Sequence, residues 1–218
     1  MFLLLSAVTN GSTLLVLGDS LSASYGISEE NGWVHLLSAD LEPQYKIVNA
    51  SISGDTSGNG LARLPRLLEE FNPNYVLIEL GANDGLRGYP LKLLKTNIEK
   101  MILMCQDKNI EPLLFGMEIP ANYGRRYSGN FAAIYPALAL QFKIPLMPFQ
   151  FEDLATSKSM IQADGIHPTV EAQKIIKSRV KSFLTPILKL EPGLQTVSRY
   201  SITSCSFCIP LYSFRAKR

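Results

Sequence analysis

The stretch LLVLGDSLSASYG (residues 14–26) joins four apolar residues directly to Gly18, Asp19 and Ser20. A short apolar run of this kind predicts a strand over residues 13–17 that is buried on both faces, as strands of parallel sheets are. The small and polar residues that follow have two interpretations. They form either a turn that caps a helix or the mouth of a sheet where a serine is exposed for chemistry.

The chain beyond this stretch alternates apolar runs with helical patterns as far as residue 190. This alternation predicts parallel strands joined by right-handed crossovers. We therefore expect an α/β fold, a three-layer α/β/α sandwich around a five-stranded parallel sheet. The further strands are predicted at 45–52, 75–80, 111–119 and 144–149, and the helices at 32–42, 57–71, 91–108, 131–142 and 170–190.

Composition supports one globular domain and argues against nucleic-acid binding. The 218 residues are 46% apolar and 18% charged, with a net charge of +2. The charge is too small, and the body of the chain has no basic stripe with interleaved aromatic residues. The chain also lacks both G-x-x-x-x-G-K-[ST] and G-x-G-x-x-G, which argues against a nucleotide or flavin site.

The two ends differ from this body. Residues 1–12 are an apolar run followed by small residues, which indicates either an extension or the remnant of an export signal. An export signal implies a periplasmic or secreted protein, and a cytoplasmic location stays open. No segment has the length to span a bilayer. Residues 191–218 have no periodicity and are predicted to be an irregular tail. Within them, Cys205 and Cys208 form a C-x-x-C pair, read as two tail thiols or, less favoured, a redox or zinc pair.

Polar residues collect where three of the predicted strands end. They lie at 18–20, 51–55 and 81–85, and a fourth cluster at 164–168 precedes the last helix. In an open parallel sheet the carboxyl ends of the strands form the ligand crevice. Each cluster alone is read as a capping or loop sequence, but their matching positions predict that they meet at one site.

The residues of these clusters are those of acyl transfer. A serine such as Ser20 becomes a nucleophile when a base removes its proton, and histidine is the usual base. His167 follows Asp164 by three residues, so one loop supplies the base and the carboxylate that orients it. The other histidine, His35, lies in a helical pattern and is read as a helix-surface or packing residue. A metal site is not expected, because no further histidine completes it.

An oxyanion in this reaction needs hydrogen-bond donors. The candidates are the backbone N–H groups of Ser20 and Gly54 and the side-chain amide of Asn83. Asp19 and Asp84 are predicted to brace the loops. The sequences GLRGYP and MEIPANYGRRYS follow Asn83 and the fourth strand, and they predict loops over the crevice. The residues that we expect to line an acyl-binding groove there, rather than a plain surface loop, are Leu86, Tyr89, Ile119, Pro120 and Tyr123.

The blocks LGDSLSASYG, NASISGDTSGNGLARLP, IELGANDGLRG and ADGIHP together resemble the four signature blocks of the SGNH (GDSL) hydrolases. The resemblance covers residues 13–190. The sequence between the blocks is similar to that of one branch of the family, which contains bacterial acyl-CoA thioesterase I, lysophospholipase L1 and arylesterase. It implies a flavodoxin-like fold, with Ser20 as nucleophile, His167 as base, Asp164 as its partner, and Gly54, Asn83 and the Ser20 amide as oxyanion donors.

The resemblance further implies hydrolysis of acyl esters and thioesters, lysophospholipids among them, with no metal or organic cofactor. Medium or longer acyl chains are the expected substrates. The alternatives are a carbohydrate O-acetyl esterase, which shares these blocks, and a catalytically silent binding domain of the same fold.

Overall fold

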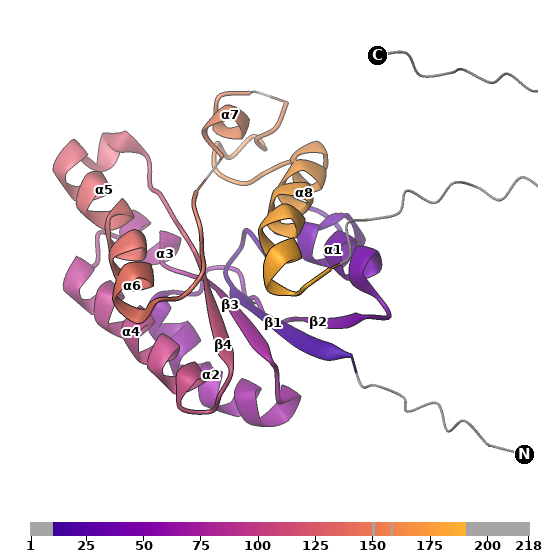
Figure 1. Cartoon of the computed structure of the whole chain (residues 1–218). Helices are drawn as coiled ribbons and strands as arrows, with labels where there is room; N and C mark the ends of the chain where they lie inside the picture. The colour runs from indigo at the N-terminus through magenta and orange to yellow at the C-terminus, as the bar shows by residue number, and fades with distance from the viewer. Residues whose placement is uncertain (1–10, 150, 158, 191–218) are drawn as a thin grey trace, which may run out of the picture.

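Five parallel strands form the central sheet of the computed structural model, which describes residues 11–149, 151–157 and 159–190 (Figure 1). Their order is β2-β1-β3-β4-β5, and every neighbouring pair is parallel. The predicted five-stranded α/β fold is therefore confirmed, and this order is that of the flavodoxin-like sheets. The strands are β1 (Ser12–Gly18), β2 (Tyr45–Asn49), β3 (Tyr75–Glu79), β4 (Glu111–Phe115) and β5 (Leu146–Met147).

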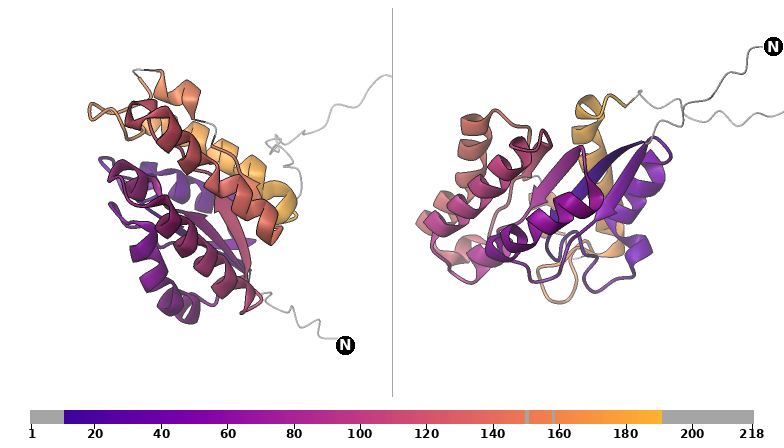
Figure 2. Two further views of the ribbon diagram at one scale, coloured as in Figure 1. Left: turned by 90° about the vertical axis from the view of Figure 1, so that its left-hand side faces the viewer. Right: turned by 90° about the horizontal axis from the view of Figure 1, so that it is seen from below.

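Helices cover both faces of this sheet, as Figures 1 and 2 show. α1 and α8 contact each other on one face, and α2, α4 and α6 line the other, with α4 between its two neighbours. The helices are α1 (Trp33–Leu41), α2 (Ser57–Phe71), α3 (Ala82–Leu86), α4 (Leu91–Gln106), α5 (Arg125–Ala132), α6 (Ile134–Phe142), α7 (Glu152–Ala155) and α8 (Val170–Ile187), with single 3-10 turns η1 (Glu29–Asn31) and η2 (Ala121–Tyr123).

β1 lies inside the sheet, between β2 and β3. Its residues Leu14 to Leu17 are fully buried, which explains their unbroken apolar character. The chain returns through α1 to β2 on one side of β1, and through α2 to β3 on the other. The carboxyl end of β1 is therefore a topological switch point, where open α/β sheets bind their ligands.

Four strands end earlier than the apolar runs predicted, β3 by one residue and β2, β4 and β5 by two or more. β2 stops at Asn49, whose side-chain Oδ1 accepts the N–H of Ser51 at 3.1 Å and turns the chain away from the sheet. β4 stops at Phe115. β5 is reduced to two residues between Pro145 and Pro148, because proline has no N–H to give to a ladder.

Two helical predictions also need correction. The single helix predicted over 131–142 is the end of α5 and the whole of α6, which meet at Ala133. α3 lies where a loop was predicted, at the end of β3. This short helix matters because Asn83 lies in its first turn.

The parts of the chain outside the described residues include most of the predicted leader and the whole predicted tail. Cys205 and Cys208 lie there as well, so those interpretations stay predictions. β1 begins at Ser12, one residue before the predicted strand. In the described part of the chain, no helix has both the length and the apolar character that a membrane crossing requires.

Candidate active site

Ser20 and His167 meet at the carboxyl end of β1. Ser20 lies two residues beyond the end of that strand, and its Oγ is 2.9 Å from Nε2 of His167. The two residues are 147 positions apart in sequence. The structure thus brings together the hydroxyl and the imidazole that the sequence proposed as nucleophile and base.

Asp164 lies on the other side of the imidazole, in the same loop as His167. Its Oδ2 is 2.6 Å from Nδ1 of His167, and its Oδ1 accepts the backbone N–H groups of His167 and Ile166. These bonds, the His167 N–H foremost, lower the pKa of Asp164 to about 2. An ionised carboxylate only accepts hydrogen bonds, so Nδ1 carries the proton and Nε2 is left to accept one from Ser20.

The loop of His167 is fastened to the loop of Ser20 by Gln162. The side-chain Nε2 of Gln162 donates to the backbone oxygens of Tyr25 and Pro168, both at 2.9 Å, and its backbone N–H donates to the oxygen of His167 at 2.8 Å. The ring of Tyr25 also packs on the imidazole, with the ring centroids 4.3 Å apart and the planes tilted by 34°. The imidazole of His167 is therefore fixed by contacts on its face as well as at its nitrogens.

Two backbone N–H groups are available beside the Ser20 hydroxyl. Within the described residues, neither Ser20 nor Gly54 has an acceptor for its N–H. The loop of Gly54 is held beside β1, because Ile52 N–H donates to the oxygen of Gly18 at 3.1 Å. Gly54 has φ +83°, a conformation that side chains disfavour.

Asn83, the third candidate donor, is half-buried at the start of α3. Its Nδ2 donates to Oδ2 of Asp19 at 3.1 Å, which brings it next to the nucleophile. The turn before it depends on Gly81, with φ +122°, because a Cβ at this position would lie 2.2 Å from the hydroxyl of Tyr135. The predicted oxyanion donors thus come from the ends of β1 and β3 and from the loop after β2.

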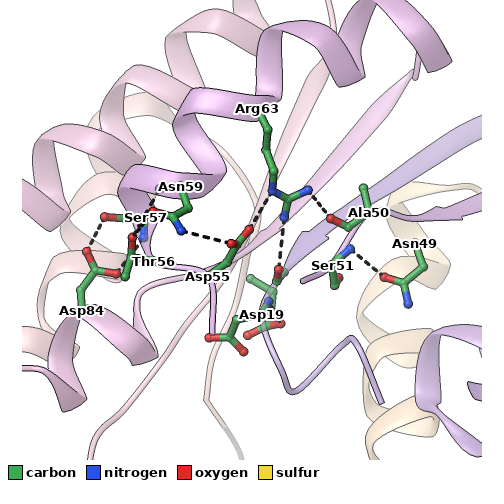
Figure 3. Close-up of polar contacts among 12 residues, drawn as sticks. Asp19, Asn49, Ala50, Ser51, Asp55, Thr56, Ser57, Asn59, Arg63 and Asp84 are labelled. Carbon is green, nitrogen blue, oxygen red and sulfur yellow. Dashed lines mark hydrogen bonds and ion pairs between the residues drawn. The ribbon is translucent and has the colours of Figure 1, made fainter. Parts of the chain in front are cut away.

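Arg63 of α2 ties these strand ends together, as Figure 3 shows. Its Nε pairs with Asp55 at 2.7 Å, and its other nitrogens donate to the backbone oxygens of Ala50 and Gly18. One half-buried guanidinium therefore holds the ends of β1 and β2 and the loop of Gly54 together.

The residues predicted to line an acyl groove have different environments. Ile119 is buried and lies close to Gly85 and the core, while Leu86 is half-buried. Tyr89, Pro120 and Tyr123 are exposed. The two segments that carry them are connected, because the hydroxyl of Tyr127 on α5 donates to the backbone oxygen of Tyr89 at 2.9 Å.

Several supporting residues were missed by sequence reasoning. Glu79 could have been noticed in the sequence, since it is the one acidic residue in the apolar run of β3, and its side chain is fully buried. Arg63, Tyr25 and Gln162 could not have been noticed, because their partners are distant in sequence. The predicted bracing role of Asp19 is confirmed by its bond from the Leu21 N–H, and that of Asp84 by its bonds from Ser57.

Two further predictions concern His35 and a possible metal site. His35 is exposed on α1, as expected for a helix-surface residue. In the part of the chain that the structure describes, no three His, Cys, Asp or Glu side chains are grouped so as to hold a metal ion.

Known proteins are similar in sequence to most of this chain. The chain is 47% identical over 176 residues to the thioesterase 1/protease 1/lysophospholipase L1 of Escherichia coli K12, covering 81% of this chain and 85% of that protein. It is 49% identical over 177 residues to an arylesterase of Vibrio mimicus, covering 79% and 88%.

Solved structures agree with these sequence relatives. The crystal structure of TesA is 47% identical with a TM-score of 0.77, covering 81% of this chain and 99% of that one. The esterase EstA from Pseudoalteromonas, in a structure inhibited by monoethylphosphonate, is 41% identical with a TM-score of 0.78, covering 82% and 99%. The family model that matches residues 16–175 is that of the GDSL-like lipase/acylhydrolases. With this match and relatives nearly half identical over four-fifths of its length, the chain belongs to the GDSL-like lipase/acylhydrolase family.

Proposed function

We propose that this ester hydrolase cleaves acyl esters and acyl thioesters, lysophospholipids among them, with Ser20, His167 and Asp164 as its catalytic residues. The observation that carries the proposal is the continuous relay from Ser20 Oγ through the imidazole to the Asp164 carboxylate. The names of the relatives, which include a thioesterase, a lysophospholipase and an arylesterase, support the substrate classes.

The relay sets the order of proton transfers. His167 Nε2 takes the proton of Ser20 as its oxygen attacks the substrate carbonyl carbon, and the resulting imidazolium is stabilised by Asp164. His167 then gives this proton to the leaving alcohol or thiol, and the acyl group stays on Ser20. A water molecule, deprotonated by the same imidazole, attacks the acyl-enzyme and releases the acid.

Three hydrogen-bond donors are assigned to stabilise the negative charge that develops on the carbonyl oxygen. These are the N–H groups of Ser20 and Gly54 and the side-chain amide of Asn83. Loss of one donor in such a site typically lowers kcat by about 10²- to 10³-fold. The acyl chain is assigned to the segments that carry Leu86, Tyr89, Pro120 and Tyr123, with Ile119 forming their support from beneath.

Covalent labelling tests the proposal directly. A fluorophosphonate probe is expected to label the wild-type protein, and Ser20→Ala is expected to lose both labelling and hydrolysis of p-nitrophenyl esters. His167→Ala should lose the labelling too, because it leaves the hydroxyl without a base. Ser128→Ala, at a half-buried serine of α5, is the matched control. Full hydrolysis by Ser20→Ala would contradict the proposal.

An acyl series separates this function from a carbohydrate O-acetyl esterase. We expect the rate on p-nitrophenyl esters to be higher for octanoyl than for acetyl, and we expect hydrolysis of acyl-CoA and of lysophosphatidylcholine. A clear maximum at acetyl would favour the O-acetyl esterase and contradict an acyl groove. A protein inert toward every ester, with Ser20 unlabelled, would instead be a binding domain.

Export to the periplasm or medium is the location that we propose, on the strength of the apolar run in residues 1–8. The test is to fractionate cells that express the full chain and to determine the N-terminus of the recovered protein. Recovery of intact chain in the cytoplasmic fraction alone would contradict it.

A further inference from the structure

Two buried acids, Asp19 and Glu79, lie directly beneath the nucleophile and take no part in the proton relay. Glu79 pairs in register with Gly18 of the neighbouring strand. Its Oε2 accepts the backbone N–H of Asp19 at 3.2 Å and the hydroxyl of Ser22 at 2.7 Å. Glu79 thus holds the chain on both sides of Ser20.

The approach of Glu79 depends on the glycine that begins the GDS motif. A Cβ at Gly18 would lie 2.4 Å from Oε2 of Glu79 and 2.9 Å from Cβ of Ser22. Gly18 therefore leaves the space that this buried carboxyl occupies. A buried acid is costly, and placing one beneath the strand end points to a use for it.

Asp19 faces Asn83 rather than the substrate. Its Oδ1 accepts the N–H of Leu21 at 3.1 Å, and its Oδ2 accepts one hydrogen of the Asn83 amide at 3.1 Å. A carboxylate has no hydrogen to donate, so it selects the amide orientation in which the nitrogen of Asn83, not the oxygen, faces Asp19. The second hydrogen on that nitrogen then points elsewhere and is available to an oxyanion.

This selection requires Asp19 to be the charged member of the acid pair. Burial, and then the charge of Asp19, raise the pKa of Glu79 well above its usual value. Burial raises the pKa of Asp19 to about 6, opposed by the hydrogen bonds with Leu21, Glu79 and Asn83 and by the charge of His167. At neutral pH the pair therefore holds one proton on Glu79, and Asp19 is ionised and acts as an acceptor.

We propose that Asp19 is a positioning residue that fixes the amide of Asn83 as an oxyanion donor, and that Glu79 supports it by anchoring the backbone of Asp19. This inference rests on the proposed function and adds to it a residue that acts through Asn83. An uncharged amide at position 19 can present either its oxygen or its NH₂ group to Asn83. Asn83 then loses its single orientation, and in the reversed one its carbonyl oxygen replaces the donor.

A double-mutant cycle on p-nitrophenyl butyrate hydrolysis tests the inference. Asn83→Ala is expected to lower kcat by about 10²-fold or more, and Asp19→Asn by about 10-fold, with KM changed less than about twofold because substrate binding is spared. If Asp19 acts through Asn83, then Asp19→Asn costs less than about twofold in the Asn83→Ala background. Independent, multiplying effects would overturn the inference, as would a change confined to KM.

The control for a general change of charge is Asp107→Asn, at an exposed acid that follows α4, and it is expected to keep wild-type kcat. Fluorophosphonate labelling of Ser20 separates the two levels of the argument. If the probe labels the wild-type protein but the effects in the double-mutant cycle multiply independently, the role of Asp19 is rejected and the proposed function stands. Absence of labelling in wild type rejects the proposed function.

A second measurement needs no change at residue 19, should Asp19→Asn not fold. The side-chain NH₂ resonances of Asn83 are assigned by their loss in Asn83→Ala and compared with those of Asn130, which is exposed on α5. Hydrogen exchange of the Asn83 amide is expected to be at least about tenfold slower, because Asp19 holds it. Equal exchange rates at the two asparagines would overturn the inference.

Discussion

The imidazole of His167 is restrained at both nitrogens and on one ring face. Asp164 and Ser20 contact the nitrogens, while Tyr25 packs against the ring from a loop that follows the nucleophile. Tyr25 is itself half-exposed, so its contact with His167 is not simply a by-product of burial. Each restraint has its own expected effect on turnover.

Replacing Asp164 by asparagine is expected to lower kcat by about 10²- to 10⁴-fold. Asparagine can present its NH₂ group to Nδ1, which favours the tautomer with the proton on Nε2, and that tautomer cannot accept the proton of Ser20. Steady-state kinetics on p-nitrophenyl butyrate measures this loss. A variant within threefold of wild type would show that Asp164 is not the orienting group.

Replacing Tyr25 separates the ring from the hydroxyl. Tyr25→Ala removes the surface that packs on His167 and is expected to lower kcat by about threefold to tenfold, in line with an aromatic contact of about 1 kcal/mol. Tyr25→Phe keeps the ring and should stay close to wild type. Measuring kcat for both variants distinguishes ring packing from a role of the phenol. An equal loss in both would assign the effect to the hydroxyl instead.

At the scale of elements, the central strand was predictable because its residues Leu14 to Leu17 are buried on both faces of the sheet and are therefore all apolar. The ends of the strands were not predictable in the same way. The run over 45–52 continues beyond Asn49 with the apolar residues Ala50 and Ile52, but the Asn49 side chain accepts the Ser51 N–H and ends the strand. α3 was missed because ANDGL has a glycine and no apolar period, and it is stabilised by tertiary contacts.

In the candidate site, too, some residues were predictable from the sequence and others were not. The clusters containing Ser20, Gly54, Asn83 and His167 were found because polar residues at strand ends are visible in sequence. Arg63 and Gln162 were not found, since each bonds backbone oxygens on distant segments. Backbone acceptors leave no trace in residue identity, so such supports emerge only from the folded arrangement.

A buried polar junction joins α2, α3 and α4. Asp84 accepts the Ser57 N–H at 2.7 Å and the Ser57 hydroxyl at 2.6 Å, and Asn97 donates to the same hydroxyl at 3.0 Å. All three side chains are buried. The junction fixes the start of α2 against the helix that carries Asn83.

Asp84→Asn is expected to destabilise the protein by about 2 kcal/mol or more. The new NH₂ group faces a donor from Ser57 and leaves a buried group without a partner. Urea denaturation followed by circular dichroism measures the free energy of unfolding. Asp107→Asn, at an exposed acid, should change it by less than about 0.5 kcal/mol. An Asp84→Asn protein as stable as wild type would mean that the junction reorganises.

For the whole molecule, Glu79 makes stability depend on pH. Its pKa in the folded state is raised well above the ordinary value of 4.5, so the folded state binds a proton that the unfolded chain releases. The stability that this proton provides is complete below pH 4.5 and is lost as the pH rises through the folded-state pKa.

Glu79→Gln removes this titration while keeping the shape of the side chain. Relative to wild type, its free energy of unfolding should increase, meaning that the variant gains stability, as the pH rises from 4.5 to 7.5, by at most about 1.4 kcal/mol per pH unit. Urea denaturation of both proteins at the two pH values measures the difference, and the comparison cancels any effect of the substitution that is independent of pH. A constant difference between the proteins would contradict a protonated Glu79.

The separation of Ser20 from His167 along the chain has a practical consequence. A chain divided ahead of residue 159 leaves Ser20, Gly54 and Asn83 in one fragment, and Asp164, His167 and the whole of α8 in the other. α8 buries Ala172, Ile176, Val180 and Leu184, which gives the smaller fragment an apolar surface with which to dock. If Ser20 and His167 act as proposed, neither half alone holds both the nucleophile and the base, so esterase turnover would report their reassembly in a fragment-complementation experiment.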